Sequence, residues 1–207
     1  MFGGSAFFAG FLISLSLILA IGAQNTFVLR QGLKRQHILP LILFCAVSDA
    51  FLICLGVLGL GALLEPIFQK YADFMLCGAA LWLGGYGVLR LREAARSSVA
   101  ALAGDAVSSL KLVLSTAVIL TFANPHVYLD TVVLIGTVSL QFDGMAKMAF
   151  AAGAMTASLV FFVVLGYCGY LLSGFMRRPQ SWRLLNSAIA LIMFVLALAM
   201  LRAGGWV

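Results

Sequence analysis

Residues 124 to 131 read NPHVYLDT, and this polar stretch lies inside a segment otherwise made mostly of Leu, Val, Ile, Ala and Phe. Pro125 has no backbone N–H and disfavours helical geometry at the residue before it. Asparagine followed by proline is typical of the N-cap and first position of a new helix. The stretch therefore predicts a broken helix over residues 110 to 140, whose second half begins in apolar surroundings. A simple proline kink absorbed by neighbouring helices is the alternative.

The composition of the chain is that of an integral membrane protein. Of its 207 residues, 63% are hydrophobic and 10% are charged, whereas about a quarter of an average soluble domain is charged. The longest connection between apolar segments lies around residues 92 to 109, which leaves no room for a separate soluble domain. A single transmembrane domain over residues 1 to 207 is therefore expected.

Neither the net charge nor the cysteines indicate a further ligand. The net charge is +6, but the basic residues are dispersed and form no stripe typical of nucleic-acid binding. The four cysteines lie in apolar segments without CxxC or metal-ligand spacing. We expect no metal, no cofactor and no nucleic-acid partner.

Six segments are long and apolar enough to cross a bilayer, whose hydrocarbon core of about 30 Å needs about 20 helical residues. They cover residues 5–29, 38–64, 72–91, 110–140, 146–175 and 184–201. Long continuous apolar runs favour helices over the short alternating strands of a barrel. The predicted fold is an all-α membrane protein with six transmembrane helices, the fourth of them broken.

The basic residues between these segments predict an orientation. The connections after the first, third and fifth segments hold three, four and three lysines or arginines, which is ten of the 13 in the chain. Because cytoplasmic loops are enriched in basic residues, these connections are expected in the cytoplasm. Both termini are then expected outside.

Three helices in each half would make the second half an inverted copy of the first, with halves of about 1–95 and 108–207. Ala23-Gln24-Asn25 in the first segment aligns with Ala123-Asn124-Pro125 in the fourth. The second and fifth segments match at one constant offset, which pairs Ala46, Ser48 and Gly61 with Ala154, Thr156 and Gly169. Chance agreement among common membrane residues is the alternative.

Two of the seven acidic residues, Asp49 and Asp130, lie well inside apolar segments. A carboxylate near the bilayer centre costs about 2.5 to 3.5 kcal/mol on insertion scales, so it needs a partner or a polar cavity. Both aspartates are therefore candidates for binding a substrate or an ion. The alternative is a structural role, in which each is hydrogen-bonded to a neighbouring helix or kept neutral.

Amide side chains and a helix start provide groups that could bind a carboxylate. Gln24 and Asn25 follow Gly22 near the end of the first segment, and their amides both donate and accept. A helix that begins at Asn124 would present free N–H groups and a positive dipole end. An interfacial location for the two amides is the alternative.

Helical spacing divides the residues that follow Pro125 between two faces. At 100° per residue, His126 and Asp130 share one face, whereas Tyr128 and Thr131 share another. All four can line one cavity only if the break rotates the helix. His126 could carry a proton or hydrogen-bond to Asp130, but a lone histidine beside a helix break more often has a local hydrogen-bonding role.

Four motifs together resemble those of the lysine/arginine exporter family, bacterial inner-membrane transporters of the LysE superfamily. They are GAQN at 22–25, QGLKRQ at 31–36, SD at 48–49 and NPHVYLDT at 124–131. The resemblance covers nearly the whole chain. It implies export of L-arginine, L-lysine and analogues such as canavanine from the cytoplasm. The family usually has proline where this chain has Ala23, which leaves Gly22 alone to break the first helix.

The expected mechanism is secondary active export by alternating access, since the chain has no nucleotide-binding motif. Asp49 and Asp130 would bind the cationic groups of the substrate, and the helix start at Asn124 with Gln24 and Asn25 would bind its carboxylate, with Tyr128 nearby. A buried carboxylate that has lost its cation takes up a proton more readily, which suggests proton antiport.

Other functions are compatible with parts of the sequence. Related exporters of neutral amino acids or of metal cations are the main alternatives, followed by a membrane enzyme that uses His126 and Asp130, and by a passive channel. Gly56 and the Gly153-xxx-Ala157 pair predict close helix packing or a homo-oligomer interface.

Overall fold

The computed structural model describes residues 3–19, 22–96, 109–174 and 178–206, and the regular elements in these ranges are all helical. The elements are α1 (Gly3–Ile18), α2 (Ala23–Lys34), α3 (Ile38–Leu55), η1 (Gly56–Leu60), α4 (Gly61–Arg96), α6 (Leu110–Phe122), α7 (Pro125–Tyr128), η2 (Leu129–Leu134), α8 (Ile135–Ser139), α9 (Gly144–Leu172) and α10 (Pro179–Ala203). The all-α class predicted from the sequence is confirmed.

Among the described residues, four helices are long and apolar enough to cross a membrane alone. They cover Ile38–Leu60, Lys70–Ala95, Gly144–Leu172 and Gln180–Ala203. Two further candidates are bent pairs of helices, α1 with α2 at 82° and α6 with the helix from His126 to Ser139 at 65°. The number of spans reaches six when each bent pair counts as one.

Both breaks lie next to the polar stretches that stand out in the sequence. α6 ends at Phe122 and α7 begins at Pro125, so the fourth segment is divided where the Asn-Pro pair predicts. The first segment is divided as well, although Ala23 stands in place of the family's proline. Gly22 precedes α2 in an extended conformation, with φ −90° and ψ 177°, and thereby ends any continuous helix.

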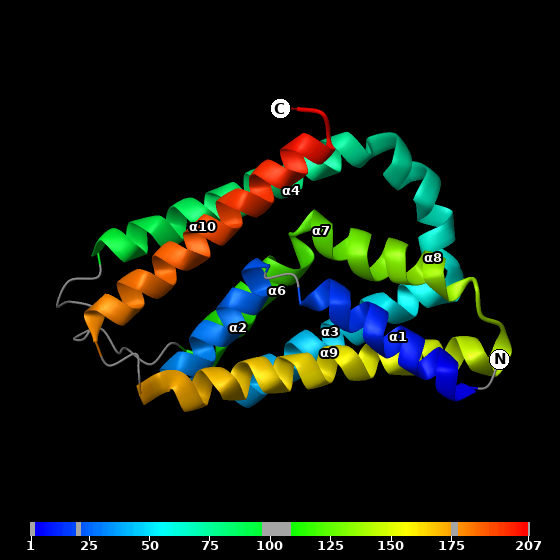
Figure 1. The fold of residues 1–207 in the computed structure, drawn as a ribbon, viewed down its shortest axis with the longest axis horizontal. Helices are drawn as coiled ribbons and strands as arrows, with labels where there is room; N and C mark the ends of the chain where they lie inside the picture. The colour runs from blue at the N-terminus through cyan, green and yellow to red at the C-terminus, as the bar shows by residue number, and fades with distance from the viewer. Residues whose placement is uncertain (1–2, 20–21, 97–108, 175–177, 207) are drawn as a thin grey trace.

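Two long helix pairs hold the bundle together. α1 lies along α9, and α4 lies beside α10 (Figure 1). A Cβ at Gly10 would clash with the Phe150 carbonyl, and one at Gly153 would clash with that of Phe7. Gly153 therefore serves packing within this chain, and the predicted homo-oligomer stays a prediction.

Two irregular turns that periodicity does not predict lie at η1, after α3, and at η2, after α7. η2 is π-helical, whereas η1 contains a kink at Gly59 (φ 105°, ψ −3°), and the two elements approach each other where Gly56 meets Val132. A Cβ on Gly56 would lie 2.6 Å from the Val132 carbonyl oxygen. Beyond η1, α4 begins at Gly61 and contains Pro66, so the stretch expected to connect the second and third segments is helical.

One end of the bundle carries several of the basic residues that the sequence assigns to the cytoplasm. The last residues of α2, α4 and α9 and the first residues of α6 and α10 lie at this end (Figure 1, left). Arg30 and Arg90 share one oxygen of Glu93, at 2.6 and 2.9 Å. This ion-pair cluster joins α2 to α4.

Candidate functional site

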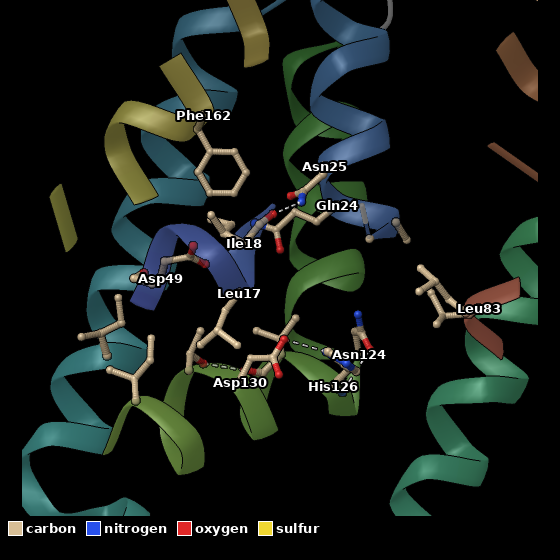
Figure 2. Close-up of a pocket in the computed structure, with 18 of the residues that line it drawn as sticks. Leu17, Ile18, Gln24, Asn25, Asp49, Leu83, Asn124, His126, Asp130 and Phe162 are labelled. Atoms are coloured by element: carbon tan, nitrogen blue, oxygen red, sulfur yellow. Dashed lines mark hydrogen bonds and ion pairs between the residues drawn. The ribbon is translucent and has the colours of Figure 1, made fainter. Parts of the chain in front are cut away.

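A cavity of about 110 Å³ lies between the two helix breaks and the helices that surround them. At roughly 10–15 Å³ for each water on this measure, it holds several waters or a small organic molecule. Five of the predicted binding residues line it: Gln24, Asn25, Asp49, Asn124 and Asp130. Residues of α2, α3 and η2 that lie far apart in the sequence thus meet at one site (Figure 2).

Asp49 enters the cavity from α3 and is held by α9. Its side chain accepts a 2.7 Å hydrogen bond from the Ser158 hydroxyl, and Asp49 is 5% exposed. The structural role that the sequence leaves open is therefore present, together with access to the cavity. One carboxylate oxygen is fixed by Ser158, and the group as a whole faces the space between the breaks (Figure 2).

Asp130 lies on η2 and has the His126 imidazole as a partner. The Nδ1 atom of His126 is 2.9 Å from an Asp130 oxygen, and the two side chains are 33% and 25% exposed. Both residues line the cavity. His126 is thus a site residue that sequence reasoning left undecided, although its spacing of four residues from Asp130 indicated the contact.

Asn124 caps the helix that follows the second break. Its Oδ1 accepts a 3.1 Å hydrogen bond from the His126 N–H, and its backbone oxygen accepts from the Val127 N–H at 3.2 Å. The predicted N-cap is confirmed. The predicted free N–H groups are not, because Pro125 has none and the next two already have acceptors.

Tyr128 lies outside the residues that line the cavity. Its hydroxyl donates to the Phe122 carbonyl at 2.9 Å and so ties the two sides of the break together. Thr131, predicted on the same face as Tyr128, does line the cavity. The π-helical turn of η2 accounts for the separation, because its i→i+5 bonding changes the angle between successive side chains.

The first break is tied together in a similar way. The Asn25 side-chain nitrogen donates to the Ile18 carbonyl at 2.8 Å, which joins the start of α2 to the end of α1. The side-chain nitrogen of Gln24 is buried and has no hydrogen-bond acceptor of ordinary geometry in the described part of the chain. Its polar neighbour is the Cys45 thiol. Gln24 therefore retains a donor at the cavity.

The remaining lining is mainly apolar. Phe162 of α9, Leu83 of α4, and Leu196 and Met200 of α10 close the cavity around the polar groups. No three His, Cys, Asp or Glu side chains among the described residues are placed to hold a metal ion. The arrangement suits a ligand that has both charged ends and an aliphatic body.

The family model for the LysE type translocator matches residues 15–204. The chain belongs to this family. It is accordingly a transporter rather than an enzyme, and a multi-pass membrane protein.

Several named relatives align over almost the whole chain. "Arginine exporter protein ArgO" of Yersinia enterocolitica is 36% identical over 202 residues, covering 97% of this chain and 98% of the relative. ArgO of Pectobacterium carotovorum is 35% identical, with the same coverage. The "Putative amino-acid transporter YggA" of Aeromonas salmonicida is 40% identical over 190 residues, or 91% and 92% of the two chains. No solved structure matches this chain.

Proposed function

We propose that this protein is a secondary active exporter of basic L-amino acids, with arginine as the first substrate to test and lysine and canavanine as further ones. The observation that carries the proposal is that two intramembrane carboxylates, Asp49 and Asp130, line one cavity between two helix breaks. A dicationic zwitterion matches two carboxylates better than a neutral amino acid does. Relatives that are named arginine exporters support the same substrate.

The substrate fits the cavity in a defined way. Asp130 is the more exposed carboxylate and binds the side-chain cation, while Asp49, anchored by Ser158, binds the α-ammonium group. The Gln24 amide nitrogen donates to the substrate carboxylate, since it is buried at the cavity and has no other acceptor of ordinary geometry among the described residues. Asn124 and Asn25 fix the two breaks and shape the cavity from either side.

Transport proceeds by alternating access between two inverted halves, residues 1–95 and 108–207. The two breaks support this division because they lie in the first and fourth segments, next to the aligned residues Gln24 and Asn124. The protein lies in the bacterial inner membrane, with its basic end in the cytoplasm and both termini outside. Inward movement of protons drives the export.

Counterflow in proteoliposomes tests the proposal. Vesicles containing the purified protein and unlabelled arginine should take up labelled arginine, while Asp49→Asn and Asp130→Asn should each abolish uptake. Asp143→Asn is the matched control, because Asp143 is exposed at the start of α9 and makes no side-chain cap. Competition by lysine but not by threonine or cadmium separates basic amino acids from the alternative substrates. Wild-type protein that moves no basic amino acid refutes the proposal.

A further inference from the structure

The cavity contains a titratable imidazole beside one of its two carboxylates. His126 Nδ1 lies 2.9 Å from Asp130 Oδ2, and both side chains are partly exposed to the cavity. The imidazole reaches Asp130 from one turn earlier, and Asn124 fixes its backbone by accepting from the His126 N–H. The position that a substrate cation needs is therefore already within reach of a side chain that can gain or lose a proton.

We propose that His126 carries the proton in the exchange, its imidazolium occupying Asp130 whenever the substrate cation is absent. This inference rests on the proposed function, because it needs a cationic substrate at Asp130. A guanidinium cannot give up its proton in a protein, so arginine arrives at Asp130 as a cation. Two cations beside one carboxylate repel each other, and the imidazolium releases its proton as arginine binds.

The charges balance through the whole cycle. On the cytoplasmic side arginine binds Asp130, the N–H bond of the imidazolium breaks and the proton enters the cytoplasm. On the other side arginine leaves, and the neutral imidazole takes up a proton from outside and pairs with Asp130 again. One proton moves in for each arginine that moves out, and the net charge of the cavity is the same in both forms.

No other charged group competes for this role among the cavity residues. Besides His126 and Asp130, Asp49 is the one titratable group that the described residues contribute to the lining, and it accepts a hydrogen bond from Ser158 on α9. The other described elements that line the cavity contribute uncharged groups to it, among them Gln24 and Asn25 from α2, Leu83 from α4, and Leu196 and Met200 from α10. The exposed imidazole is thus better placed than the tied Asp49 carboxylate to alternate with a substrate.

His126→Asn in full-length protein in proteoliposomes tests the proposal. Exchange of internal for labelled external arginine at equal pH measures the transport that needs no proton gradient, and accumulation is compared with it. Accumulation driven by an acidic interior should be lost, whereas wild type accumulates arginine about tenfold for one pH unit at a one-to-one exchange. His37→Asn is the matched control, since His37 is the other of the two histidines and precedes α3 outside the cavity lining. Undiminished accumulation in His126→Asn overturns the proposal and assigns the proton to another group.

A measurement on wild-type protein keeps the test decisive if the variant fails to fold. NMR of isotope-labelled histidine distinguishes imidazolium from imidazole. At about pH 6, where histidines are commonly protonated, adding arginine should convert one of the two histidines to the neutral form. If arginine binds and neither histidine changes, the proposal is wrong. If wild type neither binds nor exchanges arginine, it is the substrate assignment that fails.

Discussion

The Asp49 carboxylate on α3 accepts a 2.7 Å hydrogen bond from the Ser158 hydroxyl on α9. Both residues are buried. In the alignment of the two halves, the position equivalent to Asp49 is Ala157, the immediate neighbour of Ser158. The bond therefore joins nearly equivalent points of the second and fifth segments. Asp49, the buried carboxylate of the cavity, therefore lies where the two proposed halves meet.

Ser158→Ala should weaken arginine binding without preventing membrane insertion. A hydrogen bond to a charged group contributes about 1.5 to 3 kcal/mol, so the Kd for arginine should rise by about tenfold or more. Binding to purified protein measures this change. Thr156→Ala is the control, because the Thr156 hydroxyl bonds only within α9, to the Ala152 carbonyl. In an Asp49→Asn background, Ser158→Ala should cause almost no further rise in the Kd for arginine. If the two substitutions reduce the affinity for arginine additively, Ser158 acts independently of Asp49.

The sequence predicts those parts of the site that depend on strong local rules. Asp49 and Asp130 stand out because charge inside an apolar segment is costly, and the break before Pro125 follows from its missing N–H. The break at Gly22 is not predictable from Ala23, since glycine permits an extended backbone without requiring it.

Other features depend on contacts between distant segments. The π-helical turn of η2 lies where Gly56 packs closely against the Val132 carbonyl, and no periodicity in residues 129–134 predicts it. With this π-helical turn, the Thr131 side chain lines the cavity and the Tyr128 side chain does not. The free N–H groups that the Asn-Pro pair suggests are instead removed by a local contact, the hydrogen bond from the His126 N–H to the Asn124 side chain.

Gln24→Leu should separate recognition of the carboxylate from recognition of the cations. The buried Gln24 nitrogen lacks an acceptor of ordinary geometry in the described structure, so replacing it with an apolar group of similar size should leave the unfolding temperature unchanged or slightly higher. Arginine binding should weaken by about tenfold, while binding of agmatine, which lacks the carboxylate, should not change. An unaltered preference for arginine over agmatine would assign the carboxylate to another donor.

Tyr128→Phe should affect stability more than substrate binding. The Tyr128 hydroxyl bonds to the Phe122 carbonyl across the second break and does not line the cavity. Its removal should lower the free energy of unfolding by about 1 kcal/mol and leave the Kd for arginine within about twofold of wild type. Chemical denaturation and a binding isotherm on the same preparation measure both. A large loss of affinity for arginine with unchanged stability would mean that Tyr128 belongs to the substrate-binding site, as the sequence predicts.

Gly56→Ala should displace η2 and with it the carboxylate that the substrate needs. The added Cβ would lie 2.6 Å from the Val132 carbonyl oxygen, which is backbone and cannot move aside as a flexible side chain could. Overpacking of this kind costs about 1 to 3 kcal/mol. Because Val132 follows Asp130 by two residues, arginine counterflow should fall together with the unfolding temperature. Gly78→Ala is the matched control, since a Cβ at Gly78 meets nothing within 4 Å. Equal stability and equal counterflow in the two variants would mean that the crossing of η1 and η2 can widen without moving Asp130.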